Sequence, residues 1–580
     1  MHRFDVWAPG RGGVDVLVDG HRFAMTVGPG DWWHAEVAAA ATGSRYGFSL
    51  EGGEARPDPR SMSQPDGVLA LSEVVDHSAY RWSDAGWHGV PLPGLVIYEL
   101  HTGTFSRAGT FDGAIEHLPH LVELGVDAVE LMPVAEFSGN RGWGYDGVDL
   151  FAPHHAYGGP AGLKRLVDRC HGAGLAVILD VVYNHLGPAG NFLPEFGPYL
   201  SRRHRTFWGA GVNFDGPGSD EVRRFVIDNA TMWIRDYHID GLRLDAVHAI
   251  VDDSQVHVLE ELAAHVKACG HEMHRSTFVI AESDLNEPRL VHAREAGGFG
   301  LDAAWADDWH HALHTVLTGE SAGYYEDFGS FEQLAKALRQ AWVYDGERSR
   351  RRGRVRGGSP AGLTPDRFVV ATQTHDQTGN RAAGERLAGL VSPRKLKIAA
   401  ALLLTTPFTP MLFQGEEWAA ATPFLYFTDH ADADLGRAVT EGRRREFKDF
   451  GWQPDHVSDP QDPATFERSK LRWSELARSW HREMLEWYRG LLDLRRTWPA
   501  PRGAVDDEVE VAADVDACHL VFKRPGVTVR VNLGAVDWRC KVFGGESLIL
   551  ASDPGIACDG RGAKLPPESV ALFKTGTAGA

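Results

Sequence analysis

The chain has few cysteines, and it lacks the sequence features of secreted and membrane-spanning proteins. Its five cysteines form no C-x-x-C pair, which argues against a disulfide framework and against a structural zinc site. The first residues lack the apolar run of a secretory signal. No stretch of about 18 apolar residues occurs that would cross a bilayer. We therefore expect a cytoplasmic protein that has no membrane partner.

Positive charge is scarce as well. The 59 basic residues are outnumbered by 79 acidic residues, and the net charge of −20 excludes a general attraction to nucleic acids or anionic membranes. A basic segment, Arg348 to Arg356, holds six arginines in nine residues. It contains no interleaved aromatic residue, which favours a solvated loop over a nucleic-acid contact. Tryptophan is abundant instead, and the 18 tryptophans indicate either a Trp-rich core or aromatic faces that stack on sugar rings.

The two ends of the chain are predicted to be β domains. Residues 1–90 contain short alternating strands separated by Gly, Pro and Asp, which is typical of a β-sandwich. Residues 501–580 return to this pattern after a long helical region and predict a small C-terminal β domain. The strands expected in these two segments are Val14–Val18, Arg22–Met25, Tyr46–Leu50, His519–Lys523, Val527–Leu533, Ser547–Ala551 and Val570–Lys574.

Residues 91–500 are predicted to form a (β/α)₈ TIM barrel with inserted loops. Apolar strand runs alternate with helical stretches, which predicts a parallel sheet covered by helices. The runs are Leu95–Leu100, Val126–Met132, Leu175–Val182, Leu242–Asp245, Phe278–Glu282, Leu301–Trp305, Phe368–Thr372 and Met411–Phe413. A doubly wound open sheet is the alternative, but no G-x-G-x-x-G or P-loop motif follows any strand.

Two of the helices are predicted in more detail. Residues 110–124 place Phe111, Ile115, Leu118 and Val122 at helical spacing, although Pro119 interrupts the pattern. A second, longer helix is expected to begin at Ser219 as its N-cap. Its apolar residues share one face, namely Val222, Phe225, Val226 and Trp233.

Charged side chains follow four of the predicted barrel strands. In a barrel the catalytic groups come from the C-terminal ends of the strands. The four segments at these ends are Asp180–His185, Gly241–His248, Ala281–Asp284 and Thr374–Asn380. One such residue is often structural, but four in one chain are hard to explain by packing alone.

These strand ends predict a glycosidase with two main carboxylates. Side chains alternate along a strand, so Arg243 and Asp245 point the same way, and the arginine stabilises the ionised form of a nucleophile. Glu282 follows an apolar strand, and desolvation there raises the pKa of a carboxyl and favours a general acid. Asp376 supplies a third carboxylate that would hold sugar hydroxyls. The alternative for Arg243 and Asp245 is a purely structural buried ion pair.

Parts of these segments resemble the four ordered signature regions of the α-amylase superfamily of glycoside hydrolases, namely Asp180–His185, Gly241–His248, Ala281-Glu282 and His375-Asp376. The resemblance implies a retaining mechanism with Asp245 as nucleophile, Glu282 as acid/base and Asp376 as transition-state stabiliser, supported by Arg243 and Asp180. It also implies a set of substrate-binding residues. These are Tyr145, which would stack under the reacting glucose, His185 and His375, which would contact its hydroxyls, and Leu244, Ala246, Val247, His248, Gln377 and Asn380.

A narrower resemblance rests on the segments Ala306–His314, Leu412–Trp418 and Phe424–His430. They are similar to those of the maltooligosyltrehalose trehalohydrolases, which implies hydrolysis of the α-1,4 bond next to a terminal trehalose unit. The same resemblance assigns Asp308, His310 and His311 to substrate contact, and it implies a pathway partner, a maltooligosyltrehalose synthase. We expect no cofactor and no metal.

Two other functions share part of this pattern. Glycogen branching and debranching enzymes have the same carboxylates, and their loops decide whether water or a sugar hydroxyl accepts the glucan. A non-catalytic glucan-binding protein should have lost one of Asp245, Glu282 or Asp376, and all three are present. The pair His248-Ala249 stands where many amylases have Lys-His, which argues against a plain endo-amylase.

Overall fold

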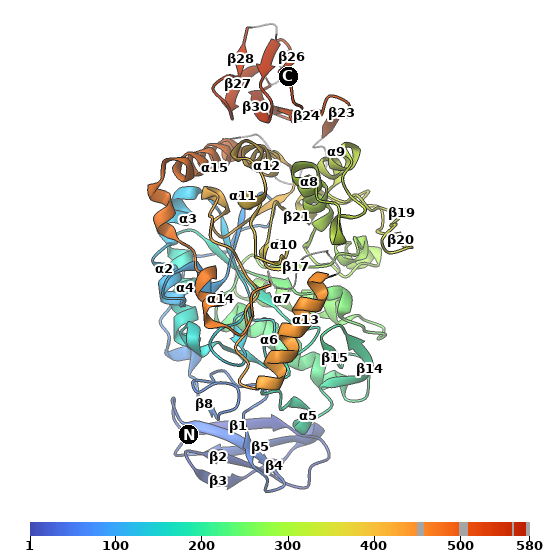
Figure 1. Ribbon diagram of the computed structural model, residues 1–580. Helices are drawn as coiled ribbons and strands as arrows, with labels where there is room; N and C mark the ends of the chain where they lie inside the picture. The colour runs from blue at the N-terminus through green and yellow to red at the C-terminus, as the bar shows by residue number, and fades with distance from the viewer. Residues whose placement is uncertain (449–456, 498–508, 560–561, 576–580) are drawn as a thin grey trace.

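A computed structural model describes residues 1–448, 457–497, 509–559 and 562–575. Antiparallel sheets lie at both ends of the molecule, with the helix-covered barrel between them (Figure 1). Among these residues, no helix combines the length and the apolar character that crossing a bilayer requires.

Eight parallel strands close into a barrel, as the sequence predicted. In barrel order they are β9 (Ile97–Leu100), β10 (Ala128–Leu131), β13 (Ala176–Val181), β16 (Gly241–Leu244), β17 (Phe278–Ala281), β18 (Ala303–Trp305), β21 (Phe368–Ala371) and β22 (Thr409–Phe413). β22 pairs with β9 and completes the closure. Almost every residue of these strands is buried, because helices cover the outside and side chains fill the interior. The predicted fold class is confirmed.

Helices follow most of the barrel strands and cover the outer face of the barrel (Figure 1). The long ones are α4 (Gly159–Gly172), α6 (Ser219–Asp236), α7 (Val258–Glu272), α8 (Asp307–Thr318), α9 (Phe331–Gln340), α12 (Pro393–Thr405), α13 (Ala433–Lys448) and α15 (Ser479–Thr497). Between β17 and β18 the chain forms only the short 3₁₀ turns η5 (Pro288–Leu290) and η6 (Arg294–Ala296).

Two details of the predicted helices were wrong. The helix expected over residues 110–124 is split into α2 (Phe111–Ile115) and α3 (Leu118–Leu124), because Pro119 begins a new helix instead of continuing the old one. The split changes the phase, so Leu121 is buried while Val122 is 43% exposed. In α6 the N-cap is Gly218, whose φ of 81° suits glycine, and Ser219 makes no capping hydrogen bond.

The terminal β domains each contain two sheets. In the N-terminal domain the first sheet contains β1 (His2–Trp7), β5 (Trp32–Val37) and β4 (Thr26–Val27). The second sheet contains β3 (His21–Ala24), β2 (Val14–Val18), β6 (Arg45–Leu50), β7 (Ala55–Arg56) and β8 (Ser72–Glu73). In the C-terminal domain the first sheet contains β23 (Glu510–Asp514), β24 (His519–Arg524), β25 (Val527–Asn532), β30 (Ser569–Lys574) and β27 (Ser547–Ala551). The second sheet contains β26 (Trp538–Lys541), β29 (Gly562–Leu565) and β28 (Ala557–Cys558). The domain boundaries at 90 and 500 stay predictions, and the second lies outside the described residues.

Inserted hairpins and short helices enlarge the loops that follow the barrel strands. They include β11 (Ala135–Glu136) with β12 (Asp149–Pro153), β14 (Leu200–Thr206) with β15 (Gly209–Val212), β19 (Glu347–Arg348) with β20 (Val355–Arg356), α5 (Leu193–Phe196), η7 (Gly323–Tyr325), α10 (His375–Gly379), α11 (Leu387–Leu390) and α14 (Pro463–Ser469). These insertions, together with the ends of the strands, supply the side chains of the candidate site.

Candidate active site

A buried arginine connects the predicted carboxylates at the end of β16. The Arg243 side chain has no exposed surface, and its Nη1 lies 2.9 Å from both carboxylate oxygens of Asp180 and 2.8 Å from Asp245 Oδ1. Its Nη2 lies 3.7 Å from Glu282 Oε2. The guanidinium also stacks over Trp305, 4.3 Å from the ring centroid. One fixed positive charge therefore orients carboxylates from three neighbouring strands.

Asp245 is held from a second side by an amide. Asn184 Nδ2 donates to Asp245 Oδ2 at 2.8 Å and to the main-chain carbonyl of Asp245 at 2.9 Å. With the contact to Arg243, these hydrogen bonds give both carboxyl oxygens of Asp245 a donor and fix the rotamer of the side chain. The next residue, Ala246, has a left-handed φ of 41° and donates its N–H to Glu282 Oε2. This turn links the Asp245 and Glu282 carboxyl groups through the backbone.

Glu282 has the environment of a proton donor. Burial raises the pKa of Glu282 well above its ordinary value, Arg243 opposes the shift, and the nearby Asp245 and Asp376 add to it. The side chain nevertheless keeps 13% of its surface exposed, so a ligand can reach it. A carboxyl group that keeps its proton beside a positioned nucleophile is the arrangement that acid-assisted nucleophilic attack requires.

Tyr145 and His375 form the opposite side of this centre. Tyr145 donates its O–H to Asp180 Oδ2 at 2.7 Å and lies 2.8 Å from His375 Nε2, so it accepts from that nitrogen. His375 Nδ1 donates to Glu99 Oε1, which makes both ring nitrogens donors. Burial lowers the pKa of His375, but Asp376 and Glu99 outweigh burial and raise it to about 9. The ring is therefore an imidazolium at neutral pH.

The other residues predicted to bind substrate near Asp245 differ in how far their side chains are exposed. His185 is buried and stacks on the partly exposed Trp208, with ring centroids 4.9 Å apart. The side chain of Leu244 lies in the hydrophobic core, 1% exposed, and that of Val247 is equally hidden. His248 is exposed. Leu244 and Val247 therefore support the site from behind.

We call the group formed by Asp180, Arg243, Asp245, Glu282 and Asp376 the carboxylate centre. A cavity of about 400 Å³ adjoins this centre, and Asp376 is also part of the cavity wall. The Asp376 side chain is 42% exposed, the most open of the three predicted catalytic carboxylates. The cavity is lined by loops that follow β17, β18 and β21. Its lining comprises Asp284, Asp307, His311, Glu320, Ser321, Ala322, Tyr324, Tyr325, Asp327, Phe328, Arg351, Arg352, Arg356, Asp376, Gln377, Asn380 and Arg381. We call it the arginine pocket.

Of the predicted substrate-contact residues, His311, Gln377 and Asn380 line the arginine pocket, whereas Asp308 and His310 do not. Asp308 has no exposed surface, and its Oδ2 accepts hydrogen bonds from Asn286 Nδ2 and from the backbone N–H groups of residues 343 and 344. His310 is buried between Thr372 O and the Tyr325 hydroxyl. Asp308 and His310 therefore lie behind the pocket wall, and their contact with substrate stays a prediction. Asp307, one residue earlier in the chain, is the acid on the wall itself.

The basic segment 348–356 is largely exposed, as predicted for a solvated loop, and three of its arginines also line the arginine pocket. Arg351, Arg352 and Arg356 line the arginine pocket, and Arg352 and Arg356 bind Asp284. The Arg351 guanidinium lies over Tyr324, 5.0 Å from the ring centroid. The absence of aromatic residues within the segment hid this contact, since its aromatic partner is supplied by η7.

Sequence reasoning missed three residues that contact the centre: Glu99, Asn184 and Trp208. Glu99 was detectable, because a lone carboxylate in the apolar strand Leu95–Leu100 needs a buried partner. Asn184 lies inside the segment that carries Asp180, although its bond to Asp245 depends on strand order. Trp208 gave no signal, because it reaches His185 from the tip of the β14–β15 hairpin.

Comparison with known proteins adds a family assignment to this geometry. Residues 67–207 match the profile described as "Alpha amylase, catalytic domain". A malto-oligosyltrehalose trehalohydrolase of Rhizobium sp. (strain M-11) is 49% identical, over 99% of this chain and 97% of that protein. A malto-oligosyltrehalose trehalohydrolase of Arthrobacter ramosus is 48% identical, over 97% of this chain and 99% of that protein. A solved structure from Salmonella typhimurium, described as an alpha amylase, covers 99% of this chain and 97% of its own, with a TM-score of 0.90 and 38% identity.

Proposed function

This chain belongs to the malto-oligosyltrehalose trehalohydrolase family, and we propose that it hydrolyses the α-1,4-glucosidic bond next to the terminal trehalose unit of maltooligosyltrehalose. The chain is a glycoside hydrolase of the α-amylase type. The observation that carries the chemistry is that Arg243 contacts both Asp245 and Glu282 and so holds the two carboxyl groups side by side, while burial raises the pKa of Glu282.

The first step of the proposed reaction is attack on the anomeric carbon. Asp245 uses a carboxylate oxygen as nucleophile, while Glu282 gives its proton to the departing glycosidic oxygen. The carbon–oxygen bond to trehalose breaks as the bond to Asp245 forms. Tyr145 supplies an aromatic face for the reacting glucose, and Asp376 accepts hydrogen bonds from sugar hydroxyls as the ring flattens. Trehalose leaves with the proton from Glu282.

The second step releases the glucan from Asp245. Glu282 is now a carboxylate and accepts a proton from water, whose oxygen attacks the same anomeric carbon. The bond to Asp245 breaks, and the shortened maltooligosaccharide keeps its α configuration. Asp245 and Glu282 both return to their starting protonation states, so the cycle closes without any other reactant.

The arginine pocket is the proposed position of the trehalose unit. It adjoins Asp376 and is built from loops, where families that share a barrel differ in specificity. Its volume of about 400 Å³ is in the range of sites for small ligands, and its many donors and acceptors match a disaccharide rich in hydroxyl groups. His311, Gln377 and Asn380 are proposed contacts there, together with Asp307 and Arg351.

The substrate has to be made by an enzyme that converts the reducing end of a maltooligosaccharide into a trehalose unit. We propose that a maltooligosyltrehalose synthase supplies it. We also propose that both proteins act in the cytoplasm.

Product analysis tests the proposed function. The protein is incubated with maltooligosyltrehalose and, separately, with amylose, and the products are separated by chromatography. We expect trehalose from the first substrate and no new branch points in the second. New α-1,6 linkages would instead identify the branching activity that remains the alternative.

A further inference from the structure

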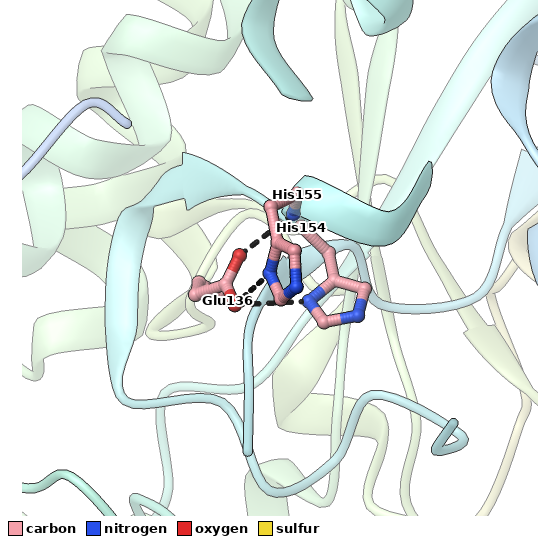
Figure 2. Close-up of side chains that lie close together, drawn as sticks. All are labelled: Glu136, His154 and His155. Atoms are coloured by element: carbon pink, nitrogen blue, oxygen red, sulfur yellow. Dashed lines mark hydrogen bonds and ion pairs between the residues drawn. The ribbon is translucent and has the colours of Figure 1, made fainter. Parts of the chain in front are cut away.

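A cluster of one glutamate and two histidines lies at the base of the loop that carries Tyr145. Glu136 is on β11, and His154 and His155 directly follow β12, so the cluster joins the two ends of the segment 137–153 (Figure 2). A carboxylate oxygen of Glu136 and one ring nitrogen of each histidine all lie within 4.8 Å of one another. None of these residues belongs to the carboxylate centre or to the arginine pocket.

His154 in this cluster lacks the partners that a buried histidine normally has. Its side chain has no exposed surface and stacks on Phe137, with ring centroids 3.8 Å apart. Its Nδ1 lies 3.2 Å from Glu136 Oε1, but outside a hydrogen-bonding angle. Among the described residues neither ring nitrogen of His154 has a hydrogen-bond partner. A buried imidazole costs free energy in this state unless another group uses its lone pair.

His155 and Glu136 are better ordered and have suitable supporting contacts. Glu136 Oε1 lies 2.6 Å from His155 Nδ1, and Glu136 Oε2 accepts from the backbone N–H of His155 at 2.8 Å. The other ring nitrogen, Nε2, lies 3.0 Å from Asn140 Oδ1. Metal-bound histidines usually donate their second N–H to such an oxygen, which fixes the ring and leaves Nδ1 for the ion.

We propose that Glu136, His154 and His155 bind one transition-metal ion of the zinc class, which holds the two ends of the Tyr145 loop together. Two imidazoles and one carboxylate suit Zn²⁺, Co²⁺ or Ni²⁺ better than Ca²⁺ or Mg²⁺, which prefer oxygen ligands alone. Water completes the coordination, because the His155 side chain is 25% exposed and connects the cluster to solvent.

The distances fit this assignment after a small adjustment. Ligand bonds of about 2.0–2.1 Å in a tetrahedron put neighbouring donor atoms about 3.3 Å apart. The separation of Glu136 Oε1 from His154 Nδ1 is 3.2 Å. The separation from His155 Nδ1 is 2.6 Å and has to widen by about 0.7 Å as the ion replaces the shared proton. That proton goes to solvent, so metal binding releases it.

Calorimetric titration of the full-length protein with ZnCl₂, after chelator treatment and dialysis, tests the proposal. We expect one saturable site per chain, and at least about tenfold weaker binding in Glu136→Gln and in His155→Gln. Glu136→Gln keeps the shape of the side chain, and its melting temperature without metal shows that the variant folds. Zinc should raise the melting temperature of the wild type and not of Glu136→Gln.

A second group, His204, Asp215 and Asp253, provides the matched control. It is more open, since Asp253 is 67% exposed, and it has one imidazole where the proposed site has two. His204→Ala should change zinc affinity by less than twofold, and bound Co²⁺ should show the strong visible absorption of a low-coordinate site. Absence of saturable binding, unchanged affinity in Glu136→Gln, or loss of binding in His204→Ala would overturn the proposal.

Discussion

The carboxylate centre and the arginine pocket adjoin each other but are built in different ways. Arg243, Asp180 and Asp245 sit at or just beyond the ends of barrel strands, and each is at most 12% exposed. The arginine pocket is formed by loops, and residues such as Tyr324 are 41% exposed. Rigid strands fix the geometry that bond cleavage needs, whereas loops change without disturbing the barrel. We therefore expect the centre to determine the reaction and the pocket to determine which leaving group is accepted.

The centre should tolerate substitution least. Asp245→Asn removes the nucleophile while keeping the contacts of the side chain, and kcat should fall at least about 10⁴-fold on maltooligosyltrehalose and on maltooligosaccharides alike. Steady-state kinetics measures the loss, and circular dichroism checks the fold. Activity above one tenth of the wild-type rate would remove Asp245 from its proposed role.

The second largest effect concerns the proton donor. Glu282→Gln should lower kcat by about 10²–10⁴-fold on both substrates. Because burial raises the pKa of Glu282, wild-type activity should fall as pH increases through that pKa and the acid loses its proton. The variant should lack this alkaline limb in its pH–rate profile. An unchanged alkaline limb would assign it to another group.

Substitutions in the arginine pocket should lower activity on maltooligosyltrehalose and leave activity on maltooligosaccharides unchanged. Arg351→Ala should lower kcat/KM for maltooligosyltrehalose by about 10–100-fold, because a charged hydrogen bond to the trehalose unit is lost. Arg350→Ala is the matched control, since Arg350 is exposed in the same segment but does not line the pocket. Equal losses in the two variants would show a general effect of charge instead.

The smallest effects distinguish the two regions by pH. The pKa of His375 is raised to about 9, so its contribution to stability is complete below about pH 6.5 and is lost as pH rises through 9. The pKa of Glu320, in the pocket wall, is lowered to about 2 by His314 and Arg381, so its contribution disappears as pH falls from about 4.5 towards 2. Melting temperatures of the wild type, His375→Gln and Glu320→Gln, measured across the pH range, test both contributions. His375→Gln should weaken only the loss of stability at alkaline pH, and Glu320→Gln only the loss at acid pH.

The difference between the regions also explains what sequence could predict. The barrel and the segments around Asp245 and Glu282 were predictable, because apolar runs followed by charged residues mark strands and their ends. The choice between Asp307 and Asp308 was not, since it depends on how the first turn of α8 is rotated against the loop at residue 343. The same holds for Arg351, whose partner Tyr324 comes from another insertion. Local patterns carry no information about such contacts between loops.

The ratio of kcat/KM for maltooligosyltrehalose to that for a maltooligosaccharide of equal length tests most directly whether chemistry and selectivity are separated. It should be measured for the wild type, Glu282→Gln and Arg351→Ala. We predict that Glu282→Gln lowers both values and leaves the ratio within twofold, while Arg351→Ala lowers the ratio about tenfold or more. A ratio that changes in Glu282→Gln and stays constant in Arg351→Ala would contradict the division between the carboxylate centre and the arginine pocket.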